Sequence, residues 1–285
     1  MGEGLLSGLE EFGLGALEGM NLFEEKKAPG ANGVAGGPGG APVLTEKDFI
    51  LEKTTKCPVC NSDFKAKVVK GSKAKLLGSD LDLRPRHQEL DTIKYGVLSC
   101  PFCGYTALIK YYPTILSVQA KKIREKISMN YRPKPDTGEI YTYDDAIDRY
   151  KLALVNAVVK EAKASEKAYI CLKSSWVLRG KAEELGEGHA EYPKYKAMEK
   201  EYTKNAYEGF MQAVSKESFP MCGMDEFTVN YLIAVLAFMT EHYDVTSKMI
   251  AAILTSQAAP ARMKDKARDL KDEVMKKLKE KNQAQ

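Results

Sequence analysis

Apolar residues recur every three or four positions from residue 113 to residue 281, the spacing that places them on one face of an α-helix. Thr142 followed by Asp145 forms a capping box at the start of one such pattern. Glycine or proline separates several of the segments. The predicted helices span about residues 114–130, with Thr114 as N-cap and Asn130 as stop, then 142–158, 165–186, 193–220, 225–242, 243–254 and 261–281.

Short connections join these segments, so consecutive helices are expected to pair as antiparallel hairpins, as in tetratricopeptide-like arrays. Residues 49–112 differ, because apolar and other residues alternate around Phe64–Val68 and around Tyr95–Ser99, with glycines between the runs. This pattern predicts short strands and turns. The expected fold class is therefore α+β, mostly α: a small zinc-ribbon-like β module over residues 49–112, followed by a helical-hairpin array over residues 113–285.

The N-terminal residues have a different composition. Residues 1–27 are acidic, and their large apolar residues are interrupted by glycines that weaken a short helix. This amphipathic segment is expected to be disordered when free and to fold only when docked. Residues 28–48 are predicted to be a flexible Gly/Pro linker. The segment could dock in cis, over the helical groove and its basic last helix, or in trans on another protein. The sequence leaves both open.

The charge balance identifies no partner class, because 43 Lys and Arg against 39 Asp and Glu give a net charge of only +4. The longest apolar run, Tyr231–Met239, is much shorter than the roughly 20 residues of a spanning helix. The first lysine is Lys26, so a basic stretch of the kind that opens a secretory signal is absent before the first apolar cluster. We therefore expect a cytoplasmic protein with no membrane association.

The strongest chemical signal is a pair of CxxC motifs, CPVC and CPFC, formed by Cys57, Cys60, Cys100 and Cys103. Four thiolates at this spacing suit one tetrahedral zinc ion with a structural role, because no ligand position is left for a reacting water. A redox dithiol, or four buried thiols, remains an alternative. Removing zinc is expected to unfold the module, whose core is small. Cys171 and Cys222 are expected to be buried without chemistry.

No catalytic set stands out in the sequence. His87, His189 and His242 lie in separate segments, and the common phosphate-binding, dinucleotide-binding, protease and esterase motifs are missing. An enzymatic function is therefore the least favoured class, although it stays open.

Two arginines in the stretch Asp80–His87 could contact a phosphate or carboxylate of a ligand or partner. They are Arg84 and Arg86, and the alternative is internal pairing with Asp80 and Asp82. Residues 51–130 also carry more basic than acidic residues, together with several aromatics. These aromatics could stack on nucleic-acid bases or simply form the core of the β module, which is the favoured interpretation.

Four stretches resemble a bacterial domain-of-unknown-function family, number 2225: CPVCNSDFKAK, DLDLRP, KYGVLSCPFCGYTAL and AYICLKSSWVLR. The resemblance implies a zinc-ribbon-like head with the four cysteines as ligands and tetratricopeptide-like helices, and it implies no reaction. The first hypothesis is a non-enzymatic cytoplasmic interaction protein that docks a protein segment on its helical array. The alternative is a nucleic-acid-binding regulator that uses the basic module.

Overall fold

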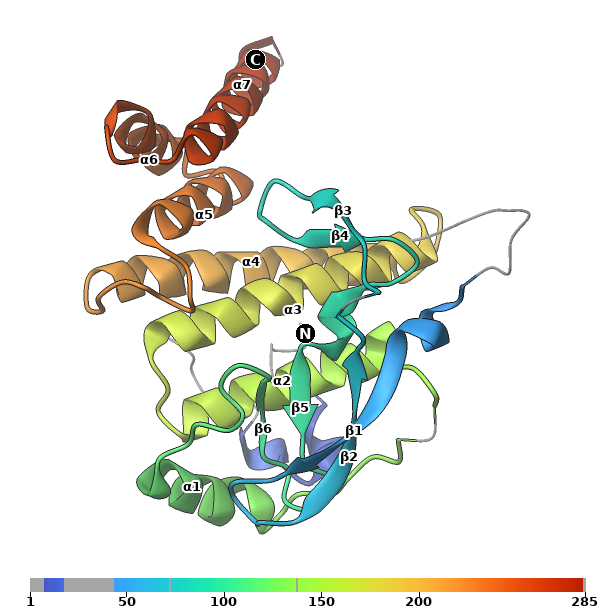
Figure 1. Cartoon of the computed structure of the whole chain (residues 1–285). Helices are drawn as coiled ribbons and strands as arrows, with labels where there is room; N and C mark the ends of the chain where they lie inside the picture. The colour runs from blue at the N-terminus through green and yellow to red at the C-terminus, as the bar shows by residue number, and fades with distance from the viewer. Residues whose placement is uncertain (1–7, 18–43, 72, 137, 284–285) are drawn as a thin grey trace.

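The computed structural model describes residues 8–17, 44–71, 73–136 and 138–283 (Figure 1). Most of the predicted acidic segment 1–27 and of the predicted linker 28–48 lies outside these residues. The described residues form seven α-helices and three two-stranded sheets. The predicted fold class, mostly α with a small β module near the N-terminal end, is confirmed.

Two of the sheets are β-hairpins that carry the CxxC motifs. Strands β1 (Ile50–Lys56) and β2 (Asp63–Val69) pair antiparallel around the first motif, and β5 (Val97–Ser99) and β6 (Thr106–Leu108) pair around the second. The third hairpin, β3 (Leu76–Ser79) with β4 (Pro85–His87), lies in the segment between the motifs. Figure 1 shows this third hairpin away from the other two, beside the long helices.

The helices follow the predicted order. They are α1 (Ser117–Ile123), continued by a π-helical turn (Arg124–Ser128), α2 (Tyr143–Val159), α3 (Ala164–Leu185), α4 (Tyr192–Val214), α5 (Glu226–Met239), α6 (Tyr243–Thr255) and α7 (Ala261–Gln283). Four 3₁₀ turns complete the described elements: Leu9–Phe12, Gly15–Leu17, Glu46–Phe49 and Thr92–Tyr95.

The two predicted helix N-caps, Thr142 and Thr114, have different outcomes. The capping box at α2 is present, since the Asp145 amide donates to Thr142 Oγ1 at 3.1 Å and the Thr142 amide donates to Asp145 Oδ2 at 2.8 Å. The prediction of Thr114 as a cap was wrong by two residues. Leu116 precedes α1, and its amide donates to the Gln119 side chain. The Thr114 hydroxyl instead donates to Tyr111 O, within the turn that follows β6.

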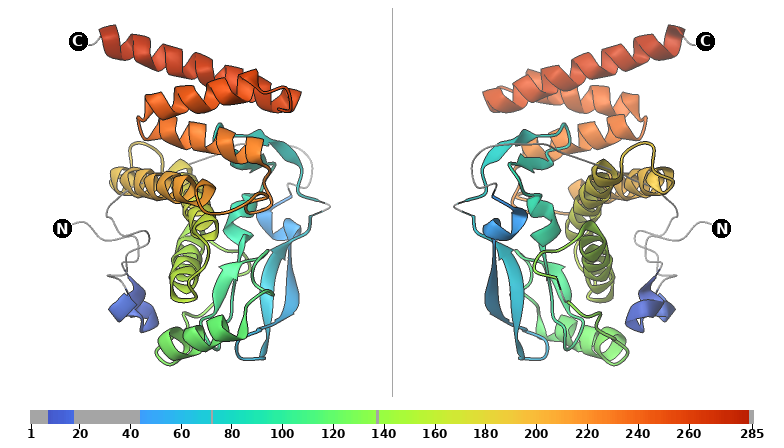
Figure 2. Two further views of the ribbon diagram at one scale, coloured as in Figure 1. Left: turned by 90° about the vertical axis from the view of Figure 1, so that its left-hand side faces the viewer. Right: turned by 90° about the vertical axis from the view of Figure 1, so that its right-hand side faces the viewer.

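Buried side chains form one continuous core from the CxxC hairpins through α2, α3 and α4 to α5. The expected domain boundary between residues 112 and 113 stays a prediction. Residues on both sides of it belong to the same buried hydrophobic cluster. A second cluster joins α5, α6 and α7. Figure 2 shows these last helices stacked as layers above α4. Consecutive helices thus build a helical array, for which a tetratricopeptide-like repeat stays a prediction.

None of the helices in the described part of the chain is both long and apolar enough to cross a membrane.

Candidate metal centre

Each CxxC motif sits in a turn of the same local structure. In the first, the Cys57 amide donates to Ser62 O at 3.0 Å and the Asn61 amide donates to Cys57 O at 2.9 Å. In the second, the corresponding donors are Cys100 and Gly104, at 2.9 and 3.0 Å. Asn61 and Gly104 have φ angles of 62° and 70°, the left-handed conformation that asparagine and glycine tolerate best. The two CxxC motifs therefore share one turn conformation.

The four cysteine sulfurs converge at one point. All four Sγ atoms lie within 4.8 Å of one another, and the Cys57–Cys103 and Cys60–Cys100 distances are both 3.6 Å. A disulfide would need about 2.05 Å. A tetrahedral ion with metal–sulfur bonds of about 2.3 Å separates its sulfurs by about 3.8 Å. Because the short distances join different motifs, the geometry fits one metal ion better than two separate dithiols.

Burial and mutual contact set the acidity of these thiols. Cys57, Cys100 and Cys103 are buried, and Cys60 is partly buried. Hydrogen bonds from Cys100 and Cys103 lower the pKa of the Cys57 thiol. Hydrogen bonding to Cys100 and Cys57, together with burial, raises the pKa of Cys103 far above its ordinary value. Four thiols this close can all ionise only when a cation compensates their charge, which is the chemistry that a divalent metal supplies.

The π-helical turn after α1 and helix α2 hold both CxxC turns in place by hydrogen bonds to backbone carbonyls. Arg124 Nη1 donates to Val59 O at 2.8 Å, and Ser128 Oγ donates to Cys103 O at 2.8 Å. Asn156 Nδ2 on α2 donates to Gly104 O at 3.1 Å. No sequence motif indicated these three residues, because their roles depend on where the helices cross the hairpins. They give the metal ligands a fixed support outside the β module.

Arg84 and Arg86, the predicted anion-contact residues, both face carboxylates of this chain. Arg84 is 2% exposed, and its Nη2 lies 2.8 Å from Asp91 Oδ2 while its Nη1 lies 3.0 Å from Glu183 Oε2. Arg86 donates to Asp80 at 2.7 and 2.8 Å and also pairs with Glu183. This arrangement agrees with the alternative of internal ion pairs, although with a wider set of acids than Asp80 and Asp82. Contact with an external anion stays a prediction.

The loop between β3 and β4 is anchored in the helical array. Asp82 is 1% exposed and accepts hydrogen bonds from Trp176 Nε1 at 2.9 Å and from Arg179 Nη2 at 2.6 Å. Leu81 and Leu83 pack on the cluster formed by α5, α6 and α7. The Tyr231 hydroxyl on α5 donates to Leu81 O at 3.0 Å. The long insertion between the two CxxC motifs therefore connects the metal module to the helices.

The ammonium of Lys173 on α3 lies between aromatic rings, 4.9 Å from the Tyr169 centroid and 5.3 Å from that of Trp176. Burial lowers the pKa of Lys173 to about 8. Charged Lys173 is therefore less stable in the folded protein than in the unfolded chain, which is a cost to the free energy of unfolding. This cost is fully present below pH 8 and disappears above about pH 10.5, where both states are neutral.

Replacing Lys173 with methionine is expected to stabilise the protein by about 1–3 kcal/mol at pH 7, because methionine packs between the rings without a charge. The gain should fall toward zero near pH 10.5. Urea unfolding at both pH values measures this. Lys276→Met, at an exposed position on α7, is the matched control and should change stability little. A variant that is less stable than wild type at pH 7 would contradict the prediction.

The three histidines occupy separate places. His87 Nδ1 lies 3.2 Å from Thr92 Oγ1, His189 Nδ1 accepts from the Glu191 amide, and the His242 ring packs on Tyr207. Within the described residues, the group found with metal-ligand geometry consists of the four cysteines and includes no histidine.

A known protein family matches most of the chain, including the four cysteines. A family model described as "Uncharacterized protein conserved in bacteria (DUF2225)" matches residues 50–274. The chain belongs to the DUF2225 family. In this DUF2225 protein the match begins at the first residue of β1 and ends inside α7, so it covers both the metal centre and the helical array. Residues 8–17 precede it. No curated protein and no solved structure matches the chain.

Proposed function

We propose that this DUF2225 protein is a non-enzymatic interaction protein, in which the four cysteines bind a structural zinc ion and the helical array docks a protein segment. Zinc is favoured among metals because it prefers four thiolate ligands in a tetrahedral arrangement. The sulfur–sulfur distances of 3.6 Å and the burial of the cluster support this choice. All four ligand positions belong to the protein, which favours a structural role over catalysis.

The observation that carries the docking proposal is the seating of the chain's own β3–β4 loop. The array binds this hairpin turn through apolar contacts of Leu81 and Leu83 and through the buried carboxylate of Asp82. An apolar groove combined with a buried polar anchor is the usual arrangement of a peptide-binding helical surface. The helices thus have the chemistry to hold a segment, and a partner would use the faces that the loop leaves open.

The ion pairs of the basic residues and the burial of most of the aromatic rings favour protein docking over nucleic-acid binding. Lys65 pairs with Glu52 at 3.0 Å and Lys94 pairs with Glu46 at 2.6 Å, so their charge is compensated. Of the aromatic rings expected either to stack on bases or to form the core, Tyr95, Tyr105 and Tyr112 are buried and Tyr111 is partly buried, whereas Phe102 is 64% exposed. Stacking on a nucleobase needs an accessible ring, and among these five aromatics Phe102 alone is exposed.

A site-specific photo-crosslinking residue at Met275 on α7, which is 49% exposed, tests docking on the array. We expect a discrete protein adduct in cell extract that persists at roughly 0.5 M NaCl, because apolar docking responds weakly to salt whereas phosphate binding does not survive it. The same residue at Leu51 on β1 is the control. Adducts formed only from β1, or removed by nuclease, would favour nucleic-acid binding instead.

A further inference from the structure

Tyr112, one of the aromatics of the β module, lies against the sulfur cluster. It is 1% exposed and belongs to the same buried cluster as Cys57, Cys100 and Cys103. Burial raises the pKa of the Tyr112 hydroxyl, and hydrogen bonding to Cys57 raises this pKa further. Negative charge on the three buried sulfurs acts in the same direction. The Tyr112 hydroxyl therefore faces the four-cysteine cluster.

Neighbouring rings fix the orientation of Tyr112. The Tyr105 ring is tilted against it with centroids 4.8 Å apart, and the Phe64 ring meets it edge-on with centroids 6.1 Å apart. The Tyr105 hydroxyl donates to Tyr112 O at 3.2 Å, and the Tyr112 amide donates to Leu108 O at 2.9 Å. Phe64 belongs to the hairpin of the first CxxC motif and Tyr105 to that of the second. Both hairpins therefore hold this ring in one position.

The contact between Tyr112 and Cys57 does not have the geometry of a regular hydrogen bond, and the buried Tyr112 hydroxyl has no other partner. A buried hydroxyl without a partner is unfavourable, and native structures seldom leave one unpaired. A thiolate held by a metal ion would satisfy it, because a charged sulfur accepts hydrogen bonds more strongly than a neutral thiol does. The sulfur cluster is therefore the place where this hydroxyl can find its acceptor.

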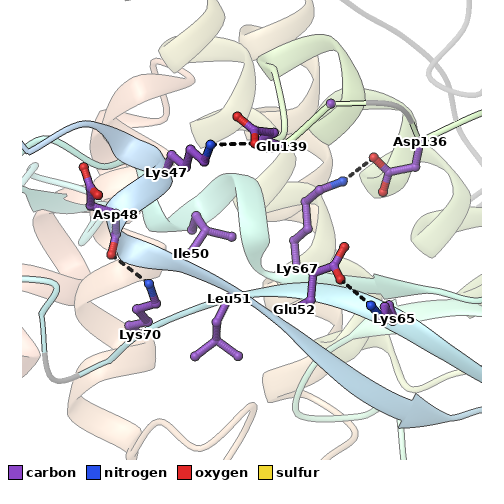
Figure 3. A pocket seen from close by; sticks show the side chains of 11 residues that line it. Lys47, Asp48, Ile50, Leu51, Glu52, Lys65, Lys67, Lys70, Asp136 and Glu139 are labelled. Atoms are coloured by element: carbon purple, nitrogen blue, oxygen red, sulfur yellow. Dashed lines mark hydrogen bonds and ion pairs between the residues drawn. The ribbon is translucent and has the colours of Figure 1, made fainter.

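Other side-chain donors near the CxxC turns are directed elsewhere. Side chains of the π-helical turn and of α2 donate to backbone carbonyls of these turns. On β2, Lys65 and Lys67 line a hollow along β1 and β2 and pair with Glu52 and Asp136 (Figure 3). Both ammonium groups therefore face carboxylates rather than sulfur. The Tyr112 hydroxyl, in contrast, is directed at a sulfur from inside the core.

We propose that Tyr112 is a positioning residue of the metal centre, and that its hydroxyl donates a hydrogen bond to the metal-bound thiolate of Cys57. This inference rests on the structural metal ion of the proposed function and names a further residue that determines how tightly the ion is held. Four thiolates around a divalent cation leave an excess of negative charge. A hydroxyl donor on one sulfur disperses part of this charge, which is how groups outside the ligand set stabilise a metal site.

Zinc competition on the full-length protein tests this contact through Tyr112→Phe, which removes the hydroxyl and keeps the ring. We expect the variant to bind zinc about 10–100-fold more weakly than wild type does against a chelating dye at neutral pH, the usual effect of losing a group that supports a metal ligand. Tyr105→Phe is the matched control, because it removes the hydroxyl of the adjacent ring, which donates to a backbone carbonyl. That variant should bind zinc as wild type does.

Cobalt substitution gives a readout that a packing effect alone would not move. A hydrogen bond lowers the energy of the sulfur electrons, so the sulfur-to-cobalt charge-transfer absorption of Tyr112→Phe should shift to longer wavelength. The absorption of Tyr105→Phe should not shift. Should Tyr112→Phe fail to fold by circular dichroism, NMR of the cadmium-loaded wild-type protein replaces it, since the Tyr112 hydroxyl proton should couple to cadmium through the Cys57 sulfur.

The possible outcomes separate this inference from the proposed zinc site. In a wild-type protein that binds metal, the role of Tyr112 alone would be overturned by equal zinc affinity of wild type and Tyr112→Phe or by an unchanged cobalt spectrum. An equal loss of zinc affinity in Tyr105→Phe, or a cadmium-loaded wild type without the coupling, would have the same consequence. A wild-type protein that takes up none of these metals would overturn both proposals.

Discussion

Full-length protein with Cys100 replaced by serine is expected to lose its metal ion and to unfold at a much lower temperature than wild type. Structural zinc contributes on the order of 10 kcal/mol in small sites, comparable to the roughly 5–15 kcal/mol that stabilises a whole domain. The cysteines belong to the continuous core that extends through α2 and α3, so the loss should spread beyond the β hairpins. Metal content by mass spectrometry and thermal unfolding by circular dichroism measure both effects.

Cys171→Ala is the matched control for this experiment. Cys171 is as buried as Cys100 but lies on α3, outside the sulfur cluster. The variant should keep the full metal content and lose only about 1 kcal/mol, the cost of a small cavity. A chelator should reproduce the Cys100→Ser result in wild type. A wild-type protein that is free of metal and fully folded would refute the structural zinc site.

Replacing Arg179 with leucine is expected to destabilise the protein by about 3–5 kcal/mol at pH 7, the usual cost of removing one partner from a buried ion pair. Arg179 lies 3.0 Å from Asp80, 2.6 Å from Asp82 and 2.6 Å from Glu199. Its loss leaves the buried carboxylates of Asp82 and Glu199 without their shared counter-charge. The β3–β4 loop should then detach from α3. Urea unfolding gives the free energy, and hydrogen exchange reports the loop.

The pH dependence distinguishes a charge effect from a packing effect. Although burial would raise it, hydrogen bonds and charge from Arg86 and Arg179 lower the pKa of Asp80, so the stability from this pairing is present above about pH 4 and is lost as the pH falls further. The difference between wild type and Arg179→Leu should therefore shrink below about pH 4. Arg268→Ala, which breaks an exposed pair with Asp265, should cost less than about 0.5 kcal/mol. A difference that does not change with pH would point to packing alone.

The four-cysteine cluster and the helices were the most predictable parts of this protein, because their signals are local. A CxxC turn needs only a few neighbouring residues, and the capping box at Thr142 and Asp145 is complete within four positions. The cap at Thr114 was misplaced because its hydroxyl is engaged by the preceding turn, which the periodicity of the helix does not record. Local rules fail where a neighbouring element competes for the same polar group.

The roles of single charged residues were less predictable. Arg84 and Arg86 were expected to face an external anion or an internal acid, and Glu183, the acid that pairs with both, lies almost one hundred positions away. Similarly, the N-terminal segment was expected over the helical groove if it docked in cis, whereas residues 8–17 lie against Tyr131 and α2. The acidic charge of the segment favoured a position near the basic last helix. The observed position of residues 8–17 instead depends on the stacking of Phe12 on Tyr131 and on a turn flanked by the left-handed residues Gly8 and Gly13.

The amino-acid sequence by itself determined the four-cysteine motif, the order of the helices, and the family to which the chain belongs, since each depends on spacing within short stretches. Only the tertiary structure decided that the insertion between the motifs lies in the helical array and that one core joins both parts. Contacts between distant residues depend on how amphipathic faces meet in space, and the same local pattern is compatible with many such pairings.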